Sequence, residues 1–125
     1  MKLLIFIALG GAGGALARHW LSTLVHSGAG SHFPFGTLSV NVLGSLGIGV
    51  MYVLIVERAV IHPDWRGVVI VGFLGAFTTF STYSLETIAL MENGQPGLAL
   101  GYALLSVALC VAAVWVSMSA TRLLA

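Results

Sequence analysis

Four long apolar stretches account for almost all of this sequence, at about residues 3–25, 36–57, 67–91 and 97–121. A helix needs roughly 20 mostly apolar residues to cross the hydrocarbon core of a bilayer. Each stretch reaches that length, and the segments between them are too short for a soluble domain. The sequence therefore predicts an all-α membrane protein, with four transmembrane helices in a single membrane domain over residues 1–125.

The composition favours the same class and excludes several others. Of the 125 residues, 58% are hydrophobic and 7% are charged, and the mean hydropathy is +1.04, which is typical of membrane proteins. A formal net charge of +1 gives no basic face that could bind nucleic acid. The single cysteine, Cys110, excludes a disulfide within the chain and a thiolate pair for zinc. No pattern typical of a catalytic nucleophile, an acid pair or a metal cluster is found, so the sequence does not favour an enzyme.

Short segments rich in turn-forming residues connect the stretches, at residues 27–35, 58–66 and 92–96. Such connections leave successive helices adjacent and antiparallel, and an even number of spans leaves both termini on one side. That side holds most of the basic residues, namely Lys2, Arg58, Arg66 and Arg122. The other side holds mainly His26, His32 and Glu92. The positive-inside rule therefore predicts cytoplasmic termini.

Glycines recur three or four residues apart in the first three stretches. Small residues at this spacing let helix backbones approach closely in lipid. Close helix packing is therefore the interpretation of three pairs, namely Gly10 with Gly14, Gly44 with Gly47, and Gly72 with Gly75.

Five serine and threonine hydroxyls gather at residues 75–84, in the middle of the third stretch. Serine and threonine compete with helical hydrogen bonds by bonding to nearby backbone, and two glycines precede them. The pattern predicts a helix broken at mid-membrane. Its freed carbonyls would suit a cation such as sodium, and its freed N–H groups an anion. The alternative is an intact helix whose hydroxyls bond to their own backbone.

Two further spans contain polar residues that an apolar helix would exclude. Asn41 lies in the second stretch, one turn after Thr37, and its amide could either join helices or line an aqueous path. In the fourth stretch three residues recur at intervals of four and share one face. This face could conduct a small ion or form a weakly polar helix seam, and its members are Tyr102, Ser106 and Cys110.

Charged residues within or near the spans also allow two interpretations each. Arg18, near the end of the first stretch, either extends to the lipid head groups or forms an electropositive vestibule that attracts anions. Glu86, which follows the hydroxyl cluster, either caps or pairs locally. The four histidines lack metal-ligand spacing and are predicted to lie at the membrane interface.

Three ordered motifs extend across nearly the whole chain. They are Gly10-Gly11-x-x-Gly14-Ala15-x-x-Arg18, then Gly36-Thr37-Leu38-x-Val40-Asn41-x-x-Gly44, and finally Gly72-x-x-Gly75-x-x-Thr78-Thr79-Phe80-Ser81-Thr82. Together these motifs resemble those of the CrcB (Fluc) family of fluoride channels. The resemblance implies a passive, fluoride-selective channel of the bacterial inner membrane that exports fluoride from the cytoplasm and relieves its toxicity.

The resemblance also implies an assembly and a set of site residues. The family forms an antiparallel dimer that encloses two pores and one central structural sodium ion, which here would bind the backbone carbonyls of Gly75 and Thr78 from both subunits. The pore would be lined by Asn41, Phe80, Tyr83, Tyr102, Ser106 and Cys110, with Thr37 and Ser81 as polar neighbours. Two departures concern conduction: Tyr83 stands where the family usually has phenylalanine, and Cys110 where it often has a hydroxyl.

Two other classes share some of these features. Small proton-coupled multidrug transporters also have four helices and an antiparallel dimer, but they need a membrane-embedded carboxylate in the first helix, and none is present there. A non-transporting membrane scaffold would account for the glycine pairs but not for Asn41 and the five hydroxyls.

Overall fold

A computed structural model describes residues 1–29 and 33–125; His32 and Gly30, in the first predicted connection, lie outside these residues. The described chain is helical between its connections. Its elements are α1 (Lys2–Ala29), α2 (Phe35–Tyr52), η1 (Val53–Glu57), η2 (Arg66–Leu74), α3 (Gly75–Phe77), α4 (Phe80–Glu92) and α5 (Pro96–Leu124).

Four helical spans are long and apolar enough to cross a membrane: Lys2–Gly28, Phe35–Glu57, Arg66–Glu92 and Pro96–Leu124. They begin within a residue of the predicted stretches, and the first and last extend about three residues further. The predicted all-helical, multi-pass architecture is confirmed. Hydropathy locates the spans well because the bilayer core contains no water, so that each segment that crosses it is a helix of mostly apolar residues along its whole length.

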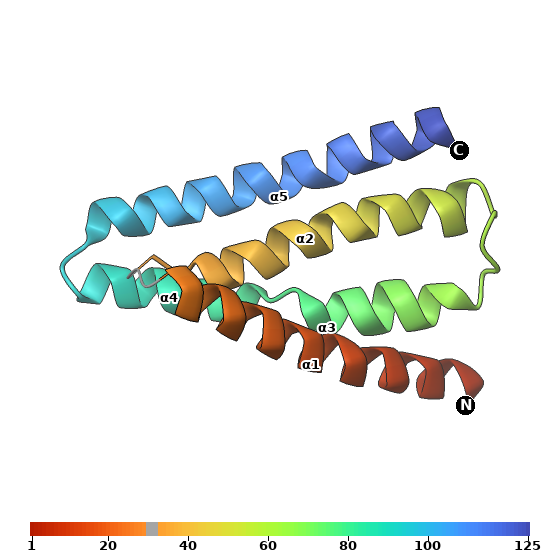
Figure 1. Cartoon of the computed structure of the whole chain (residues 1–125), viewed down its shortest axis with the longest axis horizontal. Helices are drawn as coiled ribbons and strands as arrows, with labels where there is room; N and C mark the ends of the chain where they lie inside the picture. Colours follow the sequence, from red (N-terminus) through yellow and green to blue (C-terminus); the bar gives the residue numbers. More distant parts are fainter. Residues whose placement is uncertain (30–32) are drawn as a thin grey trace.

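The spans lie side by side, with both termini at the same end (Figure 1). α1 packs against η2, α3 and α2, whereas α5 packs against α2 and α4. The second span therefore lies between α5 on one side and α1 on the other. This arrangement brings α2, the third span and α5 together around the polar residues predicted from the sequence.

Glycines allow α1 and η2 to approach at backbone distance. A Cβ atom at Gly10 would overlap the carbonyl of Val68, and one at Gly14 would overlap the carbonyl of Phe73. Gly72 makes the reciprocal approach to the α1 backbone. Helix packing is thus confirmed for these glycines. Gly75 differs, since it is exposed and a Cβ there would meet only the carbonyl of Ile70, at 3.6 Å.

The turn between the last two spans follows from local sequence. Gly94 has a φ of 76°, a left-handed conformation that favours glycine after a helix C-terminus. Pro96 then begins α5, where its fixed φ suits a first helical residue and its missing N–H removes no helical bond. Gly94 and Pro96 therefore fix a tight reversal.

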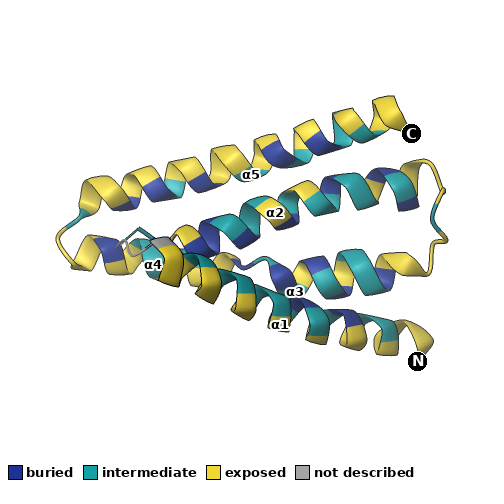
Figure 2. Cartoon of the chain, viewed as in Figure 1, coloured by how far each residue is buried: buried dark blue, intermediate teal, exposed yellow. Residues whose placement is uncertain are grey.

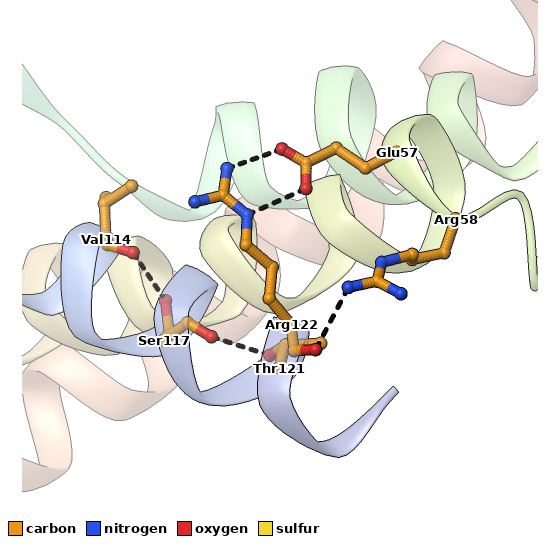
Figure 3. Close-up of polar contacts among 6 residues, drawn as sticks. All are labelled: Glu57, Arg58, Val114, Ser117, Thr121 and Arg122. Carbon is orange, nitrogen blue, oxygen red and sulfur yellow. Dashed lines mark hydrogen bonds and ion pairs between the residues drawn. The ribbon is translucent and has the colours of Figure 1, made fainter.

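Ion pairs connect the helices at the end that holds the termini. The guanidinium of Arg122 donates to both carboxylate oxygens of Glu57, and Arg58 donates to the Arg122 carbonyl at 3.0 Å (Figure 3). Lys2 contacts Asp64 at 3.3 Å. The contacts of Glu57 and Arg58 with Arg122 connect the end of the second span to α5. The contact between Lys2 and Asp64 connects α1 to the segment between the second and third spans.

Large apolar side chains cover the outside of the molecule, and exposed residues run along the outer faces of α1 and α5 (Figure 2). Leu16 and Trp115, for example, are 71% and 70% exposed. Such faces are suited to lipid contact. The main buried cluster lies between α2, α4 and α5, and consists of Leu38, Leu90, Ala99 and Tyr102.

Candidate functional site

The third span changes backbone conformation at its centre. α3 ends at Phe77, and Thr78 and Thr79 are extended, with ψ angles of 157° and 120°. The Thr78 hydroxyl donates to the Leu74 carbonyl at 3.1 Å. Side-chain bonds of this kind compete with the backbone hydrogen bonds of a helix. Helical structure resumes at Phe80.

Asn41 of α2 binds the extended segment through both ends of its amide. Its Oδ1 accepts from the Thr79 N–H at 2.7 Å, and its Nδ2 donates to the Thr79 carbonyl at 3.0 Å. The side chain thereby replaces the backbone partners that an unbroken helix would supply. An amide has two N–H donors, so Asn41 keeps one beyond the bond to Thr79. The two interpretations of Asn41, joining helices and lining a path, are therefore compatible.

The hydrogen bond from the Thr79 N–H to Asn41 also leaves the Gly75 carbonyl without its usual helical donor. In a continuous α-helix the N–H of Thr79 would donate to the carbonyl of Gly75, four residues earlier. Here that N–H donates to Asn41. The Gly75 carbonyl is thereby released from the N–H group that would bind it in a continuous helix.

Thr79 also caps the N-terminus of α4. Its hydroxyl oxygen accepts from the Thr82 N–H at 3.2 Å, which satisfies one of the first-turn donors of the helix. The remaining first-turn N–H groups and the helix dipole make this end electropositive. The extended pair thus separates a carbonyl-rich helix end from an N–H-rich helix start.

A cavity of about 390 Å³ lies beside the interruption, between α2, the third span and α5. None of the lining residues that the structure describes carries a formal charge. Seven of the predicted site residues line it, namely Asn41, Gly75, Thr78, Phe80, Tyr83, Ser106 and Cys110. Residues from three separate spans therefore converge on one space.

Two aromatic rings adjoin this cavity at the start of α4. The ring centroids of Phe80 and Tyr83 are 5.2 Å apart, and Tyr83 donates through its hydroxyl to the Ala103 carbonyl at 3.0 Å. This bond to α5 fixes the tyrosine ring in place. Phe80 is 75% exposed, so its ring projects outward from the chain.

Ser106 presents an unusual polar group to the cavity. The side chain is 5% exposed, and its hydroxyl has no hydrogen-bond partner among the described residues. Buried hydroxyls nearly always have partners, and one without a partner needs an explanation. Ser106 is also one of the residues that line the cavity.

The remaining predicted site residues lie outside the cavity lining. Tyr102 is fully buried, and its hydroxyl donates to the Glu86 carboxylate at 3.3 Å. Thr37 is also buried. Ser81 is exposed, with its hydroxyl 3.4 Å from that of Thr79. Arg18 lies on α1, which contributes no residue to the cavity.

Several lining residues were not predicted from the sequence. Ser45 and Ile48 of α2 and Val107 and Val111 of α5 also face the cavity. Ser45 lies four residues after Asn41 and therefore on the same helix face, a spacing that could have identified it. The valines carry no such signal, because apolar residues on a lipid face and on a cavity look alike in sequence.

Fold and site together define a class of protein: a small four-span membrane protein whose third span opens its backbone onto an uncharged cavity. A family model described as "CrcB-like protein, Camphor Resistance (CrcB)" matches residues 5–118. The chain belongs to this family.

Three relatives carry the name fluoride-specific ion channel FluC. One from Methylococcus capsulatus is 52% identical over 126 residues, covering 100% of this chain and 55% of that protein. One from Hahella chejuensis is 47% identical, covering 97% of this chain and 95% of the relative. One from Magnetococcus marinus is 49% identical, with coverage of 95% and 97%. The chain thus spans about half the length of the first relative and nearly all of the other two.

Proposed function

We propose that this protein is a passive, fluoride-selective channel that exports fluoride from the cytoplasm. The observation that carries the proposal is the interruption at Thr78 and Thr79, bound by Asn41 and opening onto the cavity that contains Ser106. The names of the relatives supply the identity of the ion.

The groups around the cavity suit a small anion. The second Asn41 N–H and the Ser106 hydroxyl provide neutral donors, and the α4 N-terminus adds an electropositive end. Aromatic ring edges carry partial positive charge, so the edge of Phe80 can face an anion. Because no lining residue is cationic, the ion is not held by a fixed charge and can leave, as conduction requires.

We infer that two antiparallel copies form the conducting unit, with two pores. Thr79 is the central residue of the span Arg66–Glu92, with 13 residues on each side, which favours an interruption near mid-membrane. Ser81 and Thr82 are exposed at this level, and polar side chains in the middle of a bilayer rarely face lipid. A second copy would cover them, and the exposed ring of Phe80 would then lie between the subunits.

We propose that a structural sodium ion binds at the interruption. Gly75, whose carbonyl is released from the Thr79 N–H, and Thr78 both lie there, and backbone oxygens are suitable ligands for a hard cation. Two carbonyls from each copy would supply four oxygens at the dimer centre. The ion would hold the two interrupted helices together and take no part in conduction.

The proposed location is the bacterial inner membrane. Four basic residues lie toward the end that holds the termini, namely Lys2, Arg58, Arg66 and Arg122. This bias favours cytoplasmic termini. Because it rests on four residues, it is small enough to allow some copies to insert inverted, as an antiparallel homodimer requires.

Reconstitution into liposomes loaded with potassium fluoride tests the function directly. After valinomycin is added, an electrode should record rapid, voltage-driven fluoride release, while liposomes loaded with potassium chloride should release little chloride. Trp115→Phe, a change on the lipid-facing side of α5, serves as a matched control and should release fluoride like the unaltered protein. Failure of a folded, dimeric preparation to release fluoride would refute the proposal.

A further inference from the structure

A second hollow, which shares no lining residue with the cavity, lies between the start of α1 and the start of η2. It has a volume of about 350 Å³ and is lined by Lys2, Leu3, Phe6, Ile7, Pro63, Asp64, Arg66, Gly67 and Val71. None of these residues belongs to the proposed conduction path. We propose that this hollow, called here the α1–η2 groove, binds an anionic glycerophospholipid from the surrounding leaflet.

The groove is polar at one end and apolar at the other. Lys2 and Arg66 are the first residues of the first and third spans, so their charged groups lie at the level of the lipid head groups. Ile7 follows Lys2 by five residues of α-helix, roughly 7.5 Å along the axis, and Val71 follows Arg66 by five residues of η2. The groove therefore passes from charged to apolar over the distance that separates a phosphate from the upper acyl chains.

The charges of the groove favour an anionic head group over a zwitterionic one. Lys2 and Arg66 contribute two positive charges and Asp64 one negative charge, so the lining carries a net charge of +1. A single phosphodiester, as in phosphatidylglycerol, carries the complementary charge. Basic pockets between membrane helices bind anionic head groups in this way. The start of the helix that follows Arg66 adds a favourable dipole.

The neighbouring residues favour a lipid as the occupant rather than a soluble phosphate. Trp65, 52% exposed, adjoins the groove at the level where tryptophan anchors proteins in membranes. Leu3 rests against Gly67, where a Cβ would come within 2.8 Å of the leucine methyl. Further from the charged end, the described lining consists of Phe6, Ile7 and Val71. This part of the groove is apolar, which suits an acyl chain and offers nothing to a hydrated anion.

Lipid binding can be measured on the purified full-length protein by native mass spectrometry. Phosphatidylglycerol should bind more tightly than phosphatidylcholine with the same acyl chains. Removing one cation with Lys2→Gln or Arg66→Gln should weaken phosphatidylglycerol binding about fivefold, the effect of one basic residue near a membrane surface. The double variant should lose the preference altogether.

Two further variants separate a specific site from general surface charge. Arg58→Gln removes a basic residue at the same end but outside the groove, and it should leave the preference unchanged. Asp64→Asn frees Lys2 from its ion pair and should strengthen phosphatidylglycerol binding, which provides a test even if the glutamine variants fold poorly.

Three results would overturn the proposal. They are equal losses for Arg58→Gln and Arg66→Gln, no gain for Asp64→Asn, or displacement of the lipid by millimolar glycerol phosphate. None of them would affect the proposed fluoride conduction, because binding is measured without ion transport.

Discussion

The side chain of Asn41 takes the place of backbone hydrogen-bond partners for a single residue, Thr79. By accepting from and donating to Thr79, it satisfies two main-chain groups that have no water to bind in a bilayer. This role explains why an amide is present in an otherwise apolar helix. Aspartate could accept the Thr79 N–H but could not donate to the carbonyl, and alanine could do neither.

The first prediction concerns Asn41. Asn41→Ala should lower the free energy of unfolding by about 2 kcal/mol or more, since two buried backbone groups lose their partners. Asn41→Asp should lower fluoride efflux at least about tenfold, because a negative charge beside the cavity repels the ion. Thermal unfolding and electrode-recorded efflux measure the two effects. Unchanged efflux in a folded Asn41→Asp protein would exclude Asn41 from the path.

The second prediction separates function from stability at Ser106. Its hydroxyl lacks a partner among the described residues, so Ser106→Ala should leave the unfolding midpoint unchanged or slightly raised. Fluoride efflux should fall by about tenfold, because the ion loses one donor worth roughly 1.5 kcal/mol or more.

Ser117 provides the matched control on the same helix. It is also buried, but its hydroxyl donates to the Val114 carbonyl at 3.1 Å and lies outside the cavity (Figure 3). Ser117→Ala should therefore leave efflux unchanged. If both serine variants reduced efflux equally, the assignment of Ser106 to the path would be wrong.

At the scale of elements, hydropathy predicted the spans, and the hydroxyl cluster with its glycines predicted where the third span departs from a helix. The sequence did not identify Thr79 as the residue bound by Asn41, because that contact depends on how far α2 and the third span are offset along their axes. Periodicity alone determines neither offset nor tilt.

The fourth span illustrates the same limit. Tyr102, Ser106 and Cys110 share one helix face, as predicted, yet Ser106 and Cys110 line the cavity while Tyr102 meets Glu86. Residues on one face of a helix can contact different neighbouring helices along its length, as α5 contacts both α2 and α4. Glu86 was predicted to cap or pair locally, and it pairs across to α5 instead.

The third prediction concerns the packing of α1 on η2. Gly14→Ala would place a Cβ on the Phe73 carbonyl, and the rigid backbone there cannot yield. Overpacking of this kind costs about 1 to 3 kcal/mol, so the unfolding midpoint should fall. Gly13→Ala is the control, because its Cβ would lie at an ordinary 3.5 Å from the Phe73 ring. Equal effects at the two positions would contradict the packing interpretation.

At the scale of the whole molecule, charge balance connects the fold to the proposed assembly. Lys2, Arg58, Arg66 and Arg122 lie toward one end, and two of them are paired with acids. An antiparallel homodimer made from one gene needs copies in both orientations. Lysine and arginine near the span ends set orientation, whereas acidic residues contribute little, so adding lysines at the opposite end should shift the distribution.

The last prediction uses the turn between the third and fourth spans, at the opposite end from the termini. In Asn93→Lys with Gln95→Lys, two new basic residues oppose the four at the other end, and both replaced side chains lie in the turn rather than in a span. Reporters fused to the C-terminus, one active in the cytoplasm and one active outside, should both be active for the unaltered protein. The double variant should raise the outside signal at the expense of the cytoplasmic one. A single active reporter for the unaltered protein would contradict assembly from inverted copies of one chain. If the double variant shifts the reporter signals and also alters fluoride efflux from cells, orientation is connected to the formation of the conducting dimer.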